Sequence, residues 1–202
     1  MLFGGFGGHP PLRDRVDAGQ QLARHPEIAK HANSPNTIIL ALPRGGLPVA
    51  FQVAKTLNVP LDLMLVRKLG LPYHEEVAMG AIAMGGVSYV DPTMVGRGGV
   101  TDSQLEAVRR RESAELERRT RKYRGDKPYP VLTGKNVIII DDGIATGATL
   151  RAAILAVRVH NPARIIAAAP VGAPDSVQTI GALTDEIVCL HQPRHFNAVG
   201  MW

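Results

Sequence analysis

The sequence predicts an α/β domain with a doubly wound, mostly parallel sheet of about five strands and helices on both faces. Two observations predict this class. Short runs rich in β-branched residues, with the length of buried strands, alternate with apolar-periodic segments of helical length. Turns that contain glycine lead from several of these strands into the next helix. The 202 residues are enough for one such domain with a substantial core.

The N-terminal third predicts the first βα unit. Residues 1–11 are rich in Gly and Pro and are predicted to form a flexible lead. Residues 12–32 predict a helix interrupted near Pro26, with Val16 and Ala23 facing inward. A strand over 37–42 then passes through a glycine turn into a helix over 47–57.

The middle of the chain is more polar. Residues 59–66 predict a strand that ends at Arg67 and Lys68, 70–86 a loop, and 87–90 a short strand. Residues 101–124 predict a long helix that starts with a capping-box pattern. Its basic clusters are typical of nucleic-acid-binding helices, but glutamates lie between them at ion-pair spacing. We therefore favour a solvated arm, or a contact in a homodimer, over a nucleic-acid interface.

The most informative stretch is 137–149, VIIIDDGIATGAT. A buried strand over 137–140 ends at Asp141 and Asp142, and a loop with two glycines leads into a helix. Amides and hydroxyls at a helix N-terminus favour a phosphate, whereas paired carboxylates accept hydrogen bonds from vicinal hydroxyls or bind a divalent cation. A ribose 5-phosphate satisfies both halves. The remaining elements are a strand at 164–170, a helix at 174–183 and a strand at 186–190.

This stretch resembles the phosphoribosyl pyrophosphate (PRPP) signature of the type I phosphoribosyltransferases. In addition, RDRVDAGQQLA, at 13–23, resembles the opening of a subgroup of uncharacterised phosphoribosyltransferase-like proteins. The first resemblance implies that Asp141 and Asp142 bind the ribose hydroxyls. The phosphate cradle that it implies consists of Ala145, Thr146, Gly147, Ala148 and Thr149.

The resemblance also implies a pyrophosphate loop after the first strand. There Arg44 contributes charge, and Gly45 and Gly46 let the backbone approach phosphate oxygens. We expect a strained or cis non-proline peptide at or beside Arg44. Arg67 and Lys68 are expected to bind phosphate and, with the two aspartates, to act in catalysis.

A small hood region is implied as well, in an insertion at about 70–130 and a C-terminal segment at 191–202. The whole of 12–202 would then be a single domain. In the hood, His74 and Glu75 are candidates for proton transfer, and Phe196 and Trp202 for stacking on a planar base.

The implied reaction transfers ribose 5-phosphate from PRPP to a nitrogenous base and releases pyrophosphate. Mg²⁺ would arrive with PRPP, with Asp141 or Asp142 as a further ligand and no fixed metal site. Ala145 stands where members that act on 6-oxopurines carry an aspartate, which disfavours hypoxanthine and guanine; the loop is closer to the adenine-type pattern. The alternative is a non-catalytic regulatory protein that senses PRPP or a nucleotide with the same fold.

Composition sets outer limits on these functions. No apolar run reaches membrane-spanning length and no signal pattern opens the chain, so we expect a cytoplasmic protein without membrane contact. The net charge of +5 favours an anionic ligand. The single cysteine, Cys189, rules out an intrachain disulfide or a thiolate metal cluster and is expected to be buried.

Overall fold

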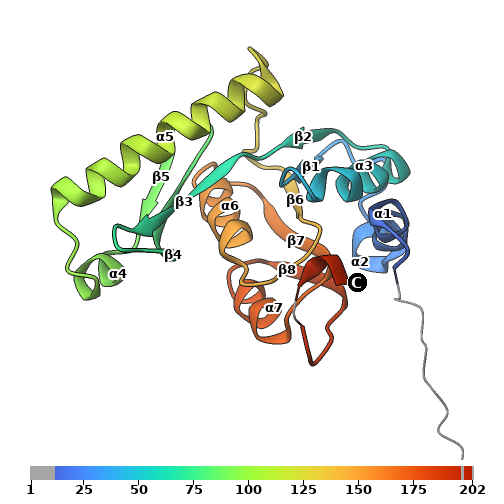
Figure 1. Ribbon diagram of the computed structural model, residues 1–202. Coiled ribbons are helices and arrows are strands. Elements are labelled where there is room, and N and C mark those ends of the chain that lie inside the picture. The colour runs from blue at the N-terminus through green and yellow to red at the C-terminus, as the bar shows by residue number, and fades with distance from the viewer. Residues whose placement is uncertain (1–11, 197, 202) are drawn as a thin grey trace, which may run out of the picture.

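The computed structural model describes residues 12–196 and 198–201 (Figure 1). Its main sheet has five strands in the order β2-β1-β6-β7-β8, and every neighbouring pair is parallel. These strands are β1 (Thr37–Ala41), β2 (Leu61–Leu63), β6 (Asn136–Ile140), β7 (Arg164–Val171) and β8 (Glu186–His191). The predicted parallel sheet is confirmed.

Helices cover both faces of this sheet, so the doubly wound prediction is also confirmed. On one face lie α1 (Arg15–Arg24), α2 (Pro26–Ala29) and α3 (Gly46–Leu57), and on the other α6 (Ala148–Arg158) and α7 (Pro174–Gly181). Alternate residues of each strand pack against the helices on opposite faces of the sheet. In β1, Ile38 and Leu40 face α6, whereas Ile39 and Ala41 face α3. Burial on both faces is why these strands read as continuous apolar runs.

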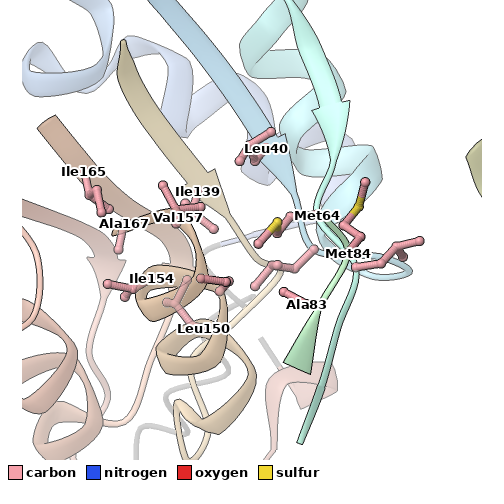
Figure 2. Packing of buried hydrophobic residues seen from close by; sticks show 14 of the residues in the cluster. Leu40, Met64, Ala83, Met84, Ile139, Leu150, Ile154, Val157, Ile165 and Ala167 are labelled. Atoms are coloured by element: carbon pink, nitrogen blue, oxygen red, sulfur yellow. The ribbon is translucent and has the colours of Figure 1, made fainter. Parts of the chain in front are cut away.

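A second sheet, of three antiparallel strands, packs beyond α6. It consists of β3 (Val66–Leu71), β4 (His74–Ala83) and β5 (Val87–Val90), followed by α4 (Pro92–Arg97) and α5 (Asp102–Arg124). We call residues 66–124 the hood. Figure 2 shows how the α6 side chains Leu150, Ile154 and Val157 lie among residues of the main sheet, such as Ile139, and of the hood, such as Ala83.

The long helix α5 is anchored to the main sheet at its C-terminal end. Arg124 is buried there, forms an ion pair with Asp62 of β2 and donates a hydrogen bond to the carbonyl of Pro128 at 2.7 Å. Farther along α5, Glu112 accepts a hydrogen bond from Arg67 of β3 at 2.7 Å. Buried, hydrogen-bonded charge pairs such as Arg124 and Asp62 tie two elements in one arrangement, because separating them leaves an uncompensated charge.

Two predictions for the middle of the chain were wrong. The predicted strand at 59–66 ends at Leu63, and Arg67 and Lys68 lie within β3 rather than at the end of a strand. Most of the predicted loop at 70–86 is the strand β4. Its glycines suggested a loop, but Gly70 and Gly80 permit close strand contacts instead: a Cβ on either would lie 2.3 Å from a carbonyl oxygen of the neighbouring strand.

The remaining elements follow the prediction closely, with two exceptions. Val16 is 43% exposed rather than inward-facing, and the short helix α4 was not predicted. Cys189 is partly buried, and this burial raises the pKa of its thiol to about 11. Within the described residues, no helix is both long and apolar enough to cross a bilayer. The predicted flexible lead at 1–11 lies outside the described residues.

Candidate functional site

The candidate site lies where the strand order of the main sheet reverses. β1 and β6 are neighbours, but α3 leads from β1 to β2 on one side and α6 leads from β6 to β7 on the other. The loops after the two strands therefore diverge at the carboxyl edge of the sheet and leave room for a ligand between them. The amide of Leu42 donates a hydrogen bond to the carbonyl of Ile140 at 2.9 Å and so keeps the loop bases together.

The loop after β1 packs directly against the two aspartates. A Cβ added to Gly45 would lie 2.0 Å from Oδ2 of Asp142, and one added to Gly46 would lie 2.6 Å from the carbonyl oxygen of Ile140. Gly46 is therefore required by the approach of the Ile140 backbone, whereas a side chain at Gly45 would have to displace the Asp142 carboxylate. The peptide between Pro43 and Arg44 is cis, as predicted, and Arg44 is exposed beside it.

The two aspartates differ in environment. Burial raises the pKa of Asp141 to about 7, and the neighbouring Asp142 carboxylate adds to this effect. Oδ1 of Asp141 accepts a hydrogen bond from the amide of Asp142 at 2.8 Å. The side chain of Asp142 is 18% exposed.

Asp142 has a partner that the sequence did not indicate. Arg15, the first residue of α1, donates to its Oδ2 from Nε at 3.0 Å and from Nη2 at 2.7 Å. Helix α1 is held in place by Gly19, where a Cβ would lie 2.6 Å from the carbonyl oxygen of Val49 in α3. Arg15 therefore orients Asp142 from across the sheet edge, while Oδ1 of Asp142 is not engaged by Arg15.

The predicted phosphate cradle is a loop that is anchored to β7 and α7 and has several exposed residues. Ile144 is buried and bridges to Gly172 after β7, and Ser176 donates a hydrogen bond to the carbonyl of Ala145 at 2.6 Å. Gly147 adopts φ +77°, a conformation that favours glycine, and α6 begins at the next residue. Ala145, Thr146 and Thr149 are exposed, and the hydroxyl of Thr146 accepts a hydrogen bond from the amide of Ala148, the first residue of α6, at 3.3 Å.

The other predicted cations lie in the hood and already have protein partners. Arg67 pairs with Glu112 of α5, which is why we regard it chiefly as a link between β3 and α5. Lys68 donates a hydrogen bond to the carbonyl of Glu76 at 3.3 Å and lies 3.5 Å from that residue's carboxylate. Both side chains therefore have protein partners in the structure, and their role as phosphate ligands stays a prediction.

The predicted hood and base residues are scattered. His74 and Glu75 are exposed at the start of β4, and Glu75 forms an ion pair with Arg111 of α5 at 3.2 Å. Phe196 is partly buried in the segment after β8, and Trp202 lies outside the described residues.

A cavity of about 280 Å³ lies between Thr146 and Gly147 of the predicted cradle and Tyr89 of the hood. Among the described residues, two more cavities flank the loops. One, of about 600 Å³, lies between α1 and the C-terminal segment, and Asp142, Arg15, Val171 and Val199 are among its lining residues. The other, of about 280 Å³, lies between the loop after β1 and α5, and is lined in part by Arg44 and Thr149. The two loops therefore connect a mostly aliphatic cavity on one side with a polar cavity on the other.

Asp141 and Asp142 are the carboxylates of the candidate site that could contact a metal ion. In the part of the chain that the structure describes, no three His, Cys, Asp or Glu side chains cluster as a metal site would require. Asp141 and Asp142 nevertheless offer carboxylate oxygens, the ligand type that Mg²⁺ prefers, and this ion commonly completes its shell with substrate oxygens and water.

Comparison with known proteins gives consistent matches. Residues 25–198 match the family described as "Phosphoribosyl transferase domain". A Mycobacterium tuberculosis H37Rv protein named "Putative phosphoribosyl transferase Rv0571c" is 42% identical over 187 residues, which are 93% of this chain and 42% of that protein. The chain therefore spans less than half the length of this relative.

Solved structures of other proteins have a similar fold. The crystal structure of TT1426 from Thermus thermophilus is similar at a TM-score of 0.83 and 38% identity, covering 95% of this chain and 89% of the other. A hypoxanthine-guanine phosphoribosyltransferase from Bacillus anthracis is similar at a TM-score of 0.51 and 16% identity, covering 90% and 79% of the two chains. That second likeness concerns the fold alone.

Proposed function

This chain belongs to the phosphoribosyl transferase domain family, and on that premise we propose that it transfers ribose 5-phosphate from PRPP to a nitrogenous base and releases pyrophosphate. The observation that carries the proposal is the contact between Gly45 and Asp142, which joins the loop suited to pyrophosphate to the acid suited to the sugar hydroxyls. A ligand with a phosphate, a diol and a diphosphate spans this arrangement.

Each part of the site has a role in this proposal. Asp141 and Asp142 accept hydrogen bonds from the ribose 2- and 3-hydroxyls, and residues 145–149 bind the 5-phosphate at the start of α6. Arg44 binds the pyrophosphate group, and Gly45 and Gly46 let the backbone approach its oxygens closely, although the amide of Gly46 itself donates to the carbonyl of Leu42 at 3.0 Å. Lys68 and Arg67 remain proposed as further phosphate ligands, which would require them to leave their present carboxylate partners.

The bond changes define what the site must stabilise. A bond forms between C1 of the ribose and a nitrogen of the base, and the bond from C1 to the pyrophosphate oxygen breaks. The pyrophosphate leaves with the electron pair, and the base loses a proton to solvent or to a nearby acceptor. Catalysis then consists of holding the two partners in line and offsetting the charge on the leaving group.

Mg²⁺ fits this proposal as a substrate-borne ion held by Asp141 or Asp142. When bound, it neutralises part of the charge that develops on pyrophosphate. The raised pKa of Asp141 means that the carboxyl must lose a proton to serve as a ligand near neutral pH. Ligand uptake is therefore expected to release protons.

The cavity of about 600 Å³ is the proposed place for the base. It adjoins Asp142, and its wall includes aliphatic side chains such as Val171 and Val199, against which a planar ring can pack. Val199 also contacts the loop, because a Cβ on Gly143 would lie 2.6 Å from it. His74 and Glu75 of the hood remain proposed participants in proton transfer.

The regulatory alternative through nucleic acid gains little from α5. Several of its arginines pair with glutamates of the same helix: Glu106 pairs with Arg109, and Glu115 with Arg118 and Arg119. These intrahelical pairs reduce the field that a phosphate backbone would meet.

The proposed function is tested by PRPP-dependent pyrophosphate release with adenine, orotate, uracil and nicotinate as acceptors, and by calorimetry with PRPP and Mg²⁺. We expect Asp142→Asn to weaken PRPP binding, whereas Asp102→Asn, an exposed carboxylate at the start of α5, should not. Binding of PRPP by Asp142→Asn as tightly as by the parent would overturn the diol assignment. Absence of PRPP uptake by the parent would overturn the function.

A further inference from the structure

The cavity of about 280 Å³ beside Arg44 has a second wall that the signature motifs do not include. That wall is the C-terminal half of α5, which contributes Arg118, Arg119, Lys122 and Tyr123 to the lining. Opposite stand Arg44 from the loop after β1 and Thr149 from the phosphate cradle. The cavity therefore lies between the two proposed phosphate loops and a cationic helix face.

The lining of this cavity is strongly positive. It carries Arg44, Arg118, Arg119 and Lys122 and, among the described residues, no carboxylate. Glu115, just outside, offsets part of this charge through ion pairs of 2.8 Å with Arg118 and with Arg119, which hold the pKa of its carboxyl at about 2. Four cations against one carboxylate leave a net positive charge, and a concave site concentrates that field.

The individual contacts show which cations are available. Arg118 is committed to Glu115 through both Nε at 2.9 Å and Nη2 at 2.8 Å. Arg119 uses only Nε for Glu115, at 2.8 Å, in the hydrogen bonds described for it. Lys122 lies over the ring of Tyr123, with its Nζ 5.6 Å from the centroid, and is exposed. Arg119 and Lys122, three residues apart, share one face of the helix.

The helix that carries these cations is fixed in position. Arg124 anchors the next turn of α5 through its buried ion pair with Asp62, and Leu116 is buried one turn before Arg119. A wall held at both ends can present its charges without first having to be ordered, which lowers the cost of binding a ligand.

We propose that α5 supplies the second half of a diphosphate site, in which Arg119 and Lys122 bind the pyrophosphate group from the side opposite Arg44. This inference rests on the proposed function and adds two ligand residues to it. Arg44 lies on one wall of the cavity, and Arg119 and Lys122 lie on the other. Such an arrangement suits a diphosphate, because both of its phosphoryl groups carry charged oxygens. In the reaction they would stabilise the charge that pyrophosphate gains when it takes the electron pair of the broken bond.

The test measures three ligands against four proteins by calorimetry with Mg²⁺: inorganic pyrophosphate, PRPP and ribose 5-phosphate. The proteins are the parent, Arg119→Gln, Lys122→Gln and the control Arg121→Gln, whose side chain is 78% exposed and pairs with Glu117. Thermal unfolding of each variant confirms that it is folded. Ribose 5-phosphate reports on the cradle and the aspartates without a diphosphate.

We expect each α5 variant to bind pyrophosphate and PRPP about tenfold more weakly, because each loses one charge-assisted hydrogen bond to the ligand. Its affinity for ribose 5-phosphate should be unchanged. Arg121→Gln should match the parent. Unchanged pyrophosphate affinity in both α5 variants, an equal loss in Arg121→Gln, or a loss for pyrophosphate without one for PRPP would overturn the inference. If the parent binds ribose 5-phosphate in those cases, the proposed sugar site stands; a parent that binds none of the ligands overturns both.

Discussion

Replacing Gly45 by alanine isolates the contact between the two loops. Gly45 has φ −63° and ψ −36°, values that alanine adopts without strain, so the substitution changes no backbone preference except to favour the helix. The added methyl group, however, would lie 2.0 Å from Oδ2 and 2.4 Å from Cγ of Asp142. The carboxylate must move by more than about 1 Å to restore ordinary carbon–oxygen contact near 3.4 Å.

The expected cost follows from that displacement. Overpacking of this kind typically costs about 1 to 3 kcal/mol, and rotating Asp142 away also breaks its two hydrogen bonds with Arg15. We therefore expect Gly45→Ala to lower the free energy of unfolding by about 2 kcal/mol and to weaken ribose 5-phosphate binding at least about tenfold.

A double-mutant cycle distinguishes the contact from a general effect of the substitution. In an Asp142→Ala background the obstructing carboxylate is absent, so Gly45→Ala should be neutral or stabilising by up to about 1 kcal/mol. Chemical denaturation of the four proteins measures this coupling. If Gly45→Ala destabilises both backgrounds equally, the loop does not depend on Asp142, and the argument for a joined site fails.

Three further predictions concern Asp141, Arg15 and Arg124. The pKa of Asp141 is raised from 3.8 to about 7, so its burial lowers the free energy of unfolding progressively as the pH rises between those values. PRPP binding should release protons, and the affinity for PRPP should increase with pH up to about pH 7. Calorimetry in buffers of different ionisation heat measures the proton release, and an unchanged release in Asp141→Asn would contradict the prediction. Arg15→Ala should weaken ribose 5-phosphate binding by about three- to tenfold, with partial recovery in Arg15→Lys, since Arg15 orients Asp142; tighter binding would show that it competes with the sugar instead. Arg124→Gln should lower the free energy of unfolding by about 2 kcal/mol in urea denaturation, because Asp62 loses its buried partner and keeps only the exposed Lys127, 3.3 Å away; a loss below about 1 kcal/mol would refute that role.

The parallel sheet could be predicted because its strands are buried on both faces. That burial leaves continuous apolar runs, such as 137–140, and glycine turns at their ends, which are local signals. The hood could not be predicted in the same way. Gly70 and Gly80 suggest a loop in the sequence, and only their strand partners show that they permit a close backbone contact.

In the candidate site, too, local sequence features could be predicted and long-range contacts could not. Each proposed phosphate loop is a short continuous stretch, and the paired aspartates directly precede the second one, so their residue types indicate a chemistry. Arg15 and Asp142 are 127 positions apart, and no periodicity or spacing in the sequence predicts their contact. Likewise, the ion pair of Arg67 with Glu112, 45 positions away in α5, could not be predicted from the sequence, which indicated only a cation near a strand.

We propose that the loops after β1 and β6 together bind a sugar phosphate. A crystal structure of the protein with ribose 5-phosphate and Mg²⁺ tests it most directly. We predict the 2- and 3-hydroxyls on Asp141 and Asp142 and the phosphate on the amides and hydroxyls of 145–149. Ribose 5-phosphate bound with its hydroxyls or its phosphate elsewhere would contradict the account.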